Sequence, residues 1–315
     1  MAAIVKKQSI DWSAYEAKAV LRGNLMLFIS PELAKAWYPS YDDSSRKSGG
    51  QTIYTDRCIE DIMALKYLFG ISYRHLEGLI RGLLSFGGLS HLPAPDRSTI
   101  NDRARAMKLK LPRLTNPKGG YVVSLDSTGL KIHGQGEWNR KKHKQKDRAN
   151  WVKVHIAIDN ASMQILAVEA TADDVQDPEV FATLIDGLPT TPGTVMGDGA
   201  YDTFDAYKRA SNDGFKLVVP PRDNAVINPK ATDPHILVRN SQVEYYQQHG
   251  IYAWANKNNY WDRNRVETTM SRFVTTFTDR LSSRTVQAQK NEIAMKCHIL
   301  NILMAANQAY QDSAA

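Results

Sequence analysis

The chain has 315 residues, of which 43% are hydrophobic and 23% charged, and its formal net charge is +7. This composition indicates a globular protein with a sizeable core and excludes a disordered or fibrous chain. No apolar run reaches the length of a membrane span, and the first residues lack the apolar segment of a signal peptide, so we expect a cytoplasmic protein without membrane association. The positive charge fits a nucleic-acid partner without requiring one.

Residues 1–115 are predicted to form a helical N-terminal domain. After a Ser/Gly-rich linker, Thr55 is placed to cap a helix over residues 56–68, and Ser72 is placed to cap a second helix. A proline-rich turn then leads into a third helix, which begins at Ser98 and ends near residue 111.

The third of these helices is polar and basic, like the recognition helix of a helix-turn-helix unit. We expect its groove-compatible donors to contact DNA, namely Ser98, Thr99, Asn101, Arg103 and Arg105. The alternative is a helical bundle with a solvated basic face. The clustering of the donors near the helix start favours the DNA-binding interpretation.

From residue 120 the hydrophobic period changes from helical to strand-like. Residues 121–126, continued by 127–132, indicate a strand that carries an aspartate and then turns. Residues 151–159 alternate well, and an Asp-Asn turn leads from them into a third strand over 164–171. We expect these strands to form an antiparallel meander.

The elements that follow predict the fold class. A helix begins at Asp177, a strand ends at Asp198, a helix is capped by Thr203, and a last strand covers residues 215–220. Three antiparallel strands followed by helix, strand, helix and strand is the order of an α/β, RNase H-like mixed sheet with flanking helices. The first and fourth strands are neighbours in that fold, which would bring Asp126 next to Asp198.

This second domain is predicted to span residues 116–315, with an inserted segment at 220–259. The inserted segment holds a helix over residues 235–248, with Gly250 as its stop. The chain closes with a long amphipathic helix over about 285–310.

Residues 260–274 are predicted to form one amphipathic helix that presents Tyr260, Arg263 and Glu267 on a shared face. A carboxylate is a hard ligand for Mg²⁺, and a guanidinium binds phosphate through two parallel hydrogen bonds. By itself, an Arg–Glu pair at this spacing is the pattern of a surface ion pair. It gains weight from the two aspartates upstream.

Asp126, Asp198 and Glu267 are the candidate catalytic metal ligands. Asp126 lies among apolar strand residues, where a carboxylate needs a compensating cation. Asp198 stands between Gly197 and Gly199, which leave room for a metal ion and a phosphate to approach. Three such carboxylates would bind two Mg²⁺ ions about 3.5–4 Å apart and stabilise the attacking and leaving oxygens of a phosphodiester displacement.

Together these motifs resemble those of the DDE transposases of bacterial insertion sequences, specifically the insertion sequence 5 family. The resemblance covers about residues 54–310 and rests on the segments 124–138, 151–159, Gly-Asp-Gly-Ala-Tyr-Asp at 197–202, 220–225, and Tyr-x2-Arg-x3-Glu at 260–267. It implies that Asp126, Asp198 and Glu267 are the metal ligands and that Tyr260 and Arg263 hold DNA phosphates.

The resemblance also implies the reaction and its partners. Such an enzyme cleaves and joins DNA at the inverted-repeat ends of its own insertion sequence, using two Mg²⁺ ions, with Mn²⁺ as a substitute, and no nucleotide cofactor. Its partners are the double-stranded DNA of the transposon ends and of the target. Because two ends are held together, we expect a homodimer or a higher synaptic complex, located in the bacterial cytoplasm at the nucleoid.

A basic stretch between the first two predicted strands is a further candidate for DNA contact. Its cations are Arg140, Lys141, Lys142, Lys144, Lys146 and Arg148, and Lys131 precedes them at the end of the first strand. A solvated hairpin tip is the alternative interpretation. Beside a phosphodiester site we favour contact with the DNA backbone.

One position departs from the family pattern, in which a lysine follows the glutamate after six intervening residues. Here that position is Val274. The departure leaves two alternatives to a full transposase. An RNase H-like DNA nuclease without strand transfer needs the same metal site. A catalytically decayed, DNA-binding relic is favoured by Val274 but disfavoured by the three intact carboxylates.

Overall fold

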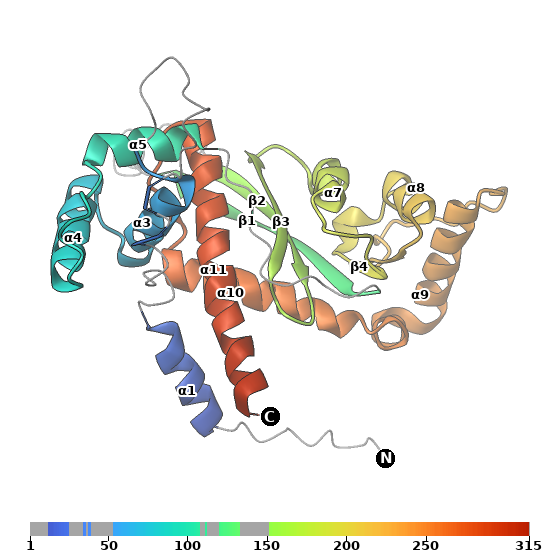
Figure 1. Cartoon of the computed structure of the whole chain (residues 1–315). Coiled ribbons are helices and arrows are strands. Elements are labelled where there is room, and N and C mark those ends of the chain that lie inside the picture. The colour runs from blue at the N-terminus through green and yellow to red at the C-terminus, as the bar shows by residue number, and fades with distance from the viewer. Residues whose placement is uncertain are drawn as a thin grey trace, which may run out of the picture.

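The computed structural model describes residues 12–24, 34–35, 37–38, 53–107, 111, 120–132 and 151–314 (Figure 1). Its first part is helical, with α1 (Trp12–Arg22), α3 (Asp56–Phe69), α4 (Tyr73–Phe86) and α5 (Arg97–Ala106). Its second part holds β1 (Val122–Ile132), β2 (Trp151–Asp159), β3 (Ile165–Ala172), α7 (Asp177–Asp186), β4 (Thr194–Met196), η3 (Gly199–Tyr201), α8 (Phe204–Asp213) and β5 (Lys216–Val218). The chain continues with α9 (Pro234–Asn258), η4 (Tyr260–Arg263), α10 (Asn264–Phe277), β6 (Arg280–Leu281) and α11 (Val286–Ala314).

Local capping sets the starts of the N-terminal helices. The hydroxyl oxygens of Thr55 and Ser72 accept first-turn backbone N–H groups at 3.0 Å and 3.3 Å, which confirms both predicted caps. The third helix starts one residue earlier than predicted, because the carboxylate of Asp96 accepts the Thr99 N–H at 2.8 Å and caps it. The helix ends at Ala106, short of the predicted end.

The sheet has the strand order β3-β2-β1-β4-β5, and β6 pairs with the far end of β1. β1, β2 and β3 are antiparallel neighbours, whereas β4 and β5 run parallel to β1. The predicted meander, the mixed sheet and the adjacency of the first and fourth strands are therefore confirmed, and the α/β fold is RNase H-like.

β1 runs straight on after Asp126, so the predicted turn in this strand is wrong. Its cross-strand pairing with β2 continues without interruption from Val123 to Lys131. Gly129 permits this, because a Cβ atom at that position would lie 2.8 Å from the ring of Trp151 on the neighbouring strand. The continuous strand carries Asp126 in its middle.

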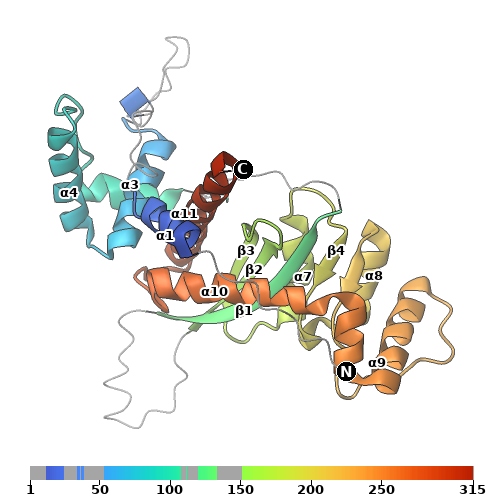
Figure 2. The ribbon, with the colours of Figure 1, turned by 90° about the horizontal axis from the view of Figure 1, so that it is seen from below.

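Helices cover both faces of the sheet (Figure 2). One face packs with α7 and α8 around apolar residues such as Val123, Leu125 and Val195. The other face packs with α10 and α11, and this core continues into α3, α4 and α5.

The predicted domain boundary between residues 115 and 116 lies outside the described residues and stays a prediction. No helix in the described part of the chain is long and apolar enough to cross a bilayer.

The backbone conformations of two residues, Gly250 and Asn259, make the helices between residues 234 and 277 differ from the prediction. Gly250 has φ 77° and kinks α9, which resumes and runs to Asn258, so this glycine is a bend and not a stop. Asn259 is left-handed at φ 52° and ends α9. A 3₁₀ turn over Tyr260–Arg263 follows, so the prediction of one α-helix that carries Tyr260, Arg263 and Glu267 is wrong.

Candidate active site

Asp126 of β1 and Asp198, which follows β4, lie at the same level of two neighbouring parallel strands. β1 and β4 are in register at Ser124 and Met196, two residues before each aspartate. Asp198 stands at the end of β4, where its carboxylate accepts the N–H of Ala200 at 2.9 Å and starts the short helix η3. The parallel register therefore places the two carboxylates at one edge, as predicted from the strand order.

Arg263 connects the third carboxylate to this pair. Its Nη2 lies 3.1 Å from Oδ1 of Asp126, and its Nη1 lies 2.7 Å from Oε1 of Glu267 in the first turn of α10. The side chain of Arg263 is 12% exposed, whereas that of Glu267 is 54% exposed. A largely buried guanidinium thus stands between two of the candidate ligands.

The charges of this cluster are strongly coupled. Burial raises the pKa of Asp126, the guanidinium of Arg263 opposes this rise, and the negative charges of Asp198 and Glu267 add to it. Burial alone would lower the pKa of Arg263, but Tyr260 and the three carboxylates together raise it. The site is therefore an acidic cluster organised around one cation.

Tyr260 contacts the segment between β4 and Asp198. Its hydroxyl donates to the carbonyl oxygen of Gly197 at 3.1 Å, immediately before Asp198. Its ring packs edge-on against buried Trp254 at 5.2 Å between centroids. Burial raises the pKa of the Tyr260 phenol to about 12, so at neutral pH it is a hydrogen-bond donor and carries no charge.

The donor set fits a divalent cation. Carboxylate oxygens are the preferred protein ligands of Mg²⁺, and Asp126 is desolvated beside two further acids, which calls for positive charge. In the described part of the chain, no three His, Cys, Asp or Glu side chains are already grouped closely enough to hold a metal ion. Between Asp126 and Glu267 the positive charge is supplied by Arg263.

A buried ion pair that the sequence analysis missed supports the segment after Asp198. Arg239 of α9 donates to both carboxylate oxygens of Asp202, at 2.7 Å and 2.8 Å. Arg222 adds hydrogen bonds from its guanidinium to the carbonyl oxygens of Gly199 and Ala200. The inserted segment thereby fixes the loop of Asp198. The sequence shows Asp202 four residues after Asp198, and Arg222 and Arg239 further on, but nothing in it indicates that these residues pair.

The predicted DNA-contacting residues of α5 make contacts within the protein. Arg103 donates to the carbonyl oxygen of Tyr54 at 2.9 Å and forms an ion pair with Asp56 at the start of α3. The hydroxyls of Ser98 and Thr99 donate to the capping Asp96, and Asn101 donates weakly to its neighbour at 3.4 Å. Arg105 is exposed in the last turn of the helix. A DNA contact by this helix stays a prediction.

The remaining candidates are only partly described. Lys131 forms an ion pair with Asp279 at 2.7 Å at the end of β1. The basic stretch with Arg140, Lys141, Lys142, Lys144, Lys146 and Arg148 lies outside the described residues. Val274, at the position of the family lysine, is exposed on α10, two turns after Glu267.

Among solved structures, the chain is similar to a piggyBac transposase synaptic complex with hairpin DNA, at 11% identity and a TM-score of 0.40, over 94% of this chain and 76% of that chain. It is also similar to a simian T-cell lymphotropic virus intasome in complex with the PP2A regulatory subunit B56 gamma. There the identity is 10% and the TM-score 0.25, over 60% of this chain and 59% of that chain.

Two family models, both described as a transposase DDE domain, match the sequence, one over residues 20–135 and the other over residues 117–302. The second match includes Asp126, Asp198 and Glu267 and spans more than half of the 315 residues, so the chain belongs to the DDE transposases.

Proposed function

We propose that this transposase cleaves and joins phosphodiesters at the inverted-repeat ends of its own insertion sequence, with Asp126, Asp198 and Glu267 as the metal-binding carboxylates. The observation that carries this proposal is the parallel register of β1 and β4, together with the Arg263 guanidinium that ties Glu267 to Asp126. Mg²⁺, with Mn²⁺ as a substitute, would be held by these carboxylates and would supply Lewis-acid stabilisation of the attacking and leaving oxygens.

The protein's own residues position the DNA. Arg263 is the counterion of Asp126 and Glu267 in the free protein, and its guanidinium geometry suits a DNA phosphate equally well. Tyr260 carries a protonated phenol next to the loop of Asp198, and its one O–H would turn from the carbonyl of Gly197 to donate to the same phosphate. Because cleavage and joining use two transposon ends at once, we further propose that a homodimer or higher complex of the chain acts on DNA.

A direct test is metal-dependent processing of a DNA duplex that carries the inverted repeats flanking the gene. The intact protein is compared with Asp126→Asn and Glu267→Gln, in Mg²⁺ and in EDTA. We expect cleavage at the end and joining to a second DNA, both lost in the two variants and in EDTA. The variants are near-isosteric, so unchanged thermal unfolding checks that they fold.

Two other outcomes would replace the proposal. Cleavage without joining would identify a nuclease with an RNase H-like core. Specific binding to the repeats without cleavage, in Mg²⁺ and in Mn²⁺ alike, would identify a DNA-binding protein that has lost its catalytic function.

A further inference from the structure

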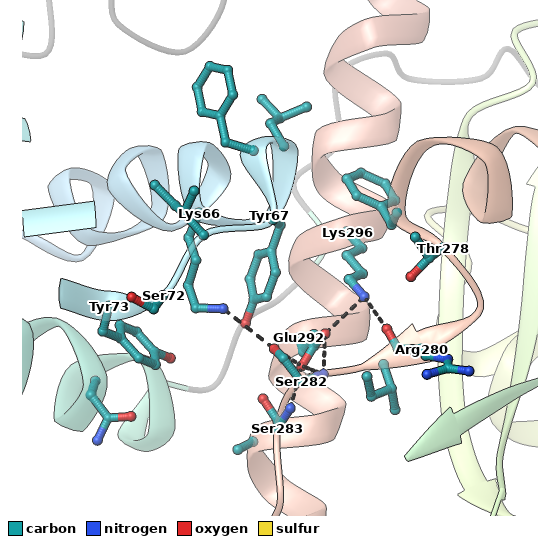
Figure 3. Close-up of a pocket in the computed structure, with 18 of the residues that line it drawn as sticks. Lys66, Tyr67, Ser72, Tyr73, Thr278, Arg280, Ser282, Ser283, Glu292 and Lys296 are labelled. Atoms are coloured by element: carbon teal, nitrogen blue, oxygen red, sulfur yellow. Dashed lines mark hydrogen bonds and ion pairs between the residues drawn. The ribbon is translucent and has the colours of Figure 1, made fainter. Parts of the chain in front are cut away.

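A large pocket with both apolar and charged lining lies between the N-terminal helices and the end of the chain (Figure 3), and none of the three candidate carboxylates lines it. Its volume is about 1100 Å³. The end of α3 and the start of α4 form one wall, α5 contributes Asn101 and Arg105, and the opposite wall is the segment from Thr276 to Thr285 with α11. The pocket therefore joins the predicted DNA-binding helices to the sheet.

The lining of this pocket is strongly cationic. Its basic residues are Lys66, Arg105, Arg280, Arg284 and Lys296, and Glu292 is its one acidic residue. The carboxylate of Glu292 is already occupied, because it accepts the N–H groups of Ser282 and Ser283 and pairs with Lys296 at 2.8 Å. The lining thus holds more cations than its one acid can pair, although Arg280 also pairs with Asp279 outside the pocket, at 4.0 Å.

Among these cations Lys296, at 3% exposure, is paired with Glu292, and Lys66 is also buried, at 7% exposure. Its ammonium contacts the hydroxyl of Ser282 at 3.4 Å and lies over the rings of Tyr67 and Tyr73, at 4.6 Å and 5.0 Å from their centroids. No carboxylate in the described part of the chain lies within ion-pair distance of it. Burial lowers the pKa of Lys66, the nearby negative charge of Glu292 opposes this, and the positive charge of Lys296 adds to it.

The strand β1 relates the pocket to the carboxylate cluster. Lys131 pairs in the sheet with Arg280, which lines the pocket, and Asp126 lies five residues earlier on the same strand. Five residues of strand span roughly 17 Å. A DNA duplex rises about 3.4 Å per base pair, so this span corresponds to about five base pairs.

We propose that this pocket binds a backbone phosphate of the transposon-end DNA, about five base pairs from the phosphodiester at Asp126, with the buried ammonium of Lys66 as its central contact. The inference rests on the proposed function, since it assigns a second contact to the same DNA. The bound phosphate would give Lys66 a direct ion-pair partner, whereas Glu292 now reaches it only through the hydroxyl of Ser282. It would also clamp α3 and α5 against the strand β6, so that DNA binding and the placement of the carboxylate cluster are linked.

The first test uses Lys66→Met, which keeps the length of the side chain and removes its charge. The matched control is Lys208→Met on α8, an exposed lysine outside the pocket. We expect Lys66→Met to raise the melting temperature of the free protein, because a buried ammonium without a direct ion pair is removed, and to weaken binding of the end duplex roughly tenfold. The slope of log affinity against log salt should fall by about one in this variant and hardly change in the control.

The second test locates the phosphate. Single neutral methylphosphonates are placed along each strand of the end duplex, and binding is measured with the intact protein and with Lys66→Met. The inference predicts one position, about five base pairs from the cut, where the modification weakens binding of the intact protein but has no effect on the variant. Equal effects of every modification on both proteins would overturn it.

A further arm separates a DNA phosphate from a free anion. Inorganic phosphate is added at constant ionic strength, and the melting temperature of both proteins is followed. Stabilisation by phosphate that needs Lys66, without any coupled methylphosphonate position, would mean a small-anion site and would overturn the DNA assignment. If the intact protein neither binds nor cleaves the end duplex, the proposed function fails as well. If cleavage persists and Lys66→Met binds normally, only this inference fails.

Discussion

Nη2 of Arg263 lies 3.1 Å from Oδ1 of Asp126, so an arginine of the protein occupies the position of a counterion among the candidate metal ligands. The same guanidinium contacts Glu267 at 2.7 Å. The charge of two of the carboxylates is therefore compensated before metal and DNA arrive. It also means that a metal ion and Arg263 compete for the same negative charge.

Replacing this arginine should make the protein more responsive to metal. In Arg263→Gln the carboxylates lose their cation, so we expect a lower melting temperature in EDTA and a larger rise with added Mg²⁺ than in the intact protein. Thermal unfolding against MgCl₂ concentration measures both effects. The double variant with Asp126→Asn is the control, and it should show a much smaller rise. An equal Mg²⁺ response in the intact protein and in Arg263→Gln would contradict this competition.

The ion pair between Asp202 and Arg239 should be essential for stability although it lies outside the carboxylate cluster. Both side chains are buried, at 0% and 8% exposure, so removing one leaves the other charge desolvated and unpaired. We expect Asp202→Ala to cost about 3–5 kcal/mol in the free energy of unfolding. Urea denaturation measures this value.

The matched variant is Asp202→Leu combined with Arg239→Met, which removes both charges and should cost clearly less than Asp202→Ala. The same urea titration compares them. A double variant as unstable as the single one would show that packing of these side chains, and not their charge, holds the inserted segment.

The stability of the protein should fall in mild acid because of His298. This imidazole is buried on α11, its Nδ1 has no hydrogen-bond partner among the described residues, and burial, with a smaller effect from Arg57, lowers its pKa to about 4. The unfolded chain binds the proton near pH 6.5, so stability is complete above that pH and is lost as the pH falls toward 4. The loss amounts to about 3 kcal/mol.

The measurement is the free energy of unfolding of the intact protein and of His298→Leu across this pH window. The variant cannot take up the proton, so between pH 6.5 and pH 4 it should lose about 3 kcal/mol less stability than the intact protein. Parallel pH profiles of the two proteins would assign the acid sensitivity to other groups.

Val274 offers a gain-of-function test of the family pattern. It is 36% exposed on α10, so Val274→Lys should change the free energy of unfolding by no more than about 0.5 kcal/mol. The added ammonium stands two turns from Glu267 on the same helix and should tighten binding of the end duplex at low salt. Binding titrations at two salt concentrations check this, with Val274→Gln as the uncharged control. Unchanged affinity would show that DNA does not reach this part of α10.

Much of the fold could be predicted from local sequence patterns. Thr55 and Ser72 cap their helices as expected, because a side-chain oxygen next to a first-turn N–H needs no distant partner. The alternation in β2 and β3 predicted the meander, and the order of elements predicted that the strands of Asp126 and Asp198 are neighbours. These features depend on residues close in sequence or on the few topologies that an α/β sheet allows.

Other features were decided only by contacts between distant segments. Gly250 bends a helix that the local pattern would end, because α9 continues to pack through Trp254 and Ala255. The partner of Asp202 is 37 residues away, and the hydroxyl that Lys66 contacts is 216 residues away. No periodicity encodes such pairs.

The sequence alone therefore determined most helices and strands and the order of the strands in the sheet, and it singled out the three carboxylates as candidate metal ligands. The tertiary structure decided how charges are compensated: Arg263 stands between Asp126 and Glu267, and Lys66 reaches Glu292 only through the hydroxyl of Ser282. The physical reason is that propensity and capping are local properties of the chain, whereas desolvation and charge pairing depend on every group that folding brings near.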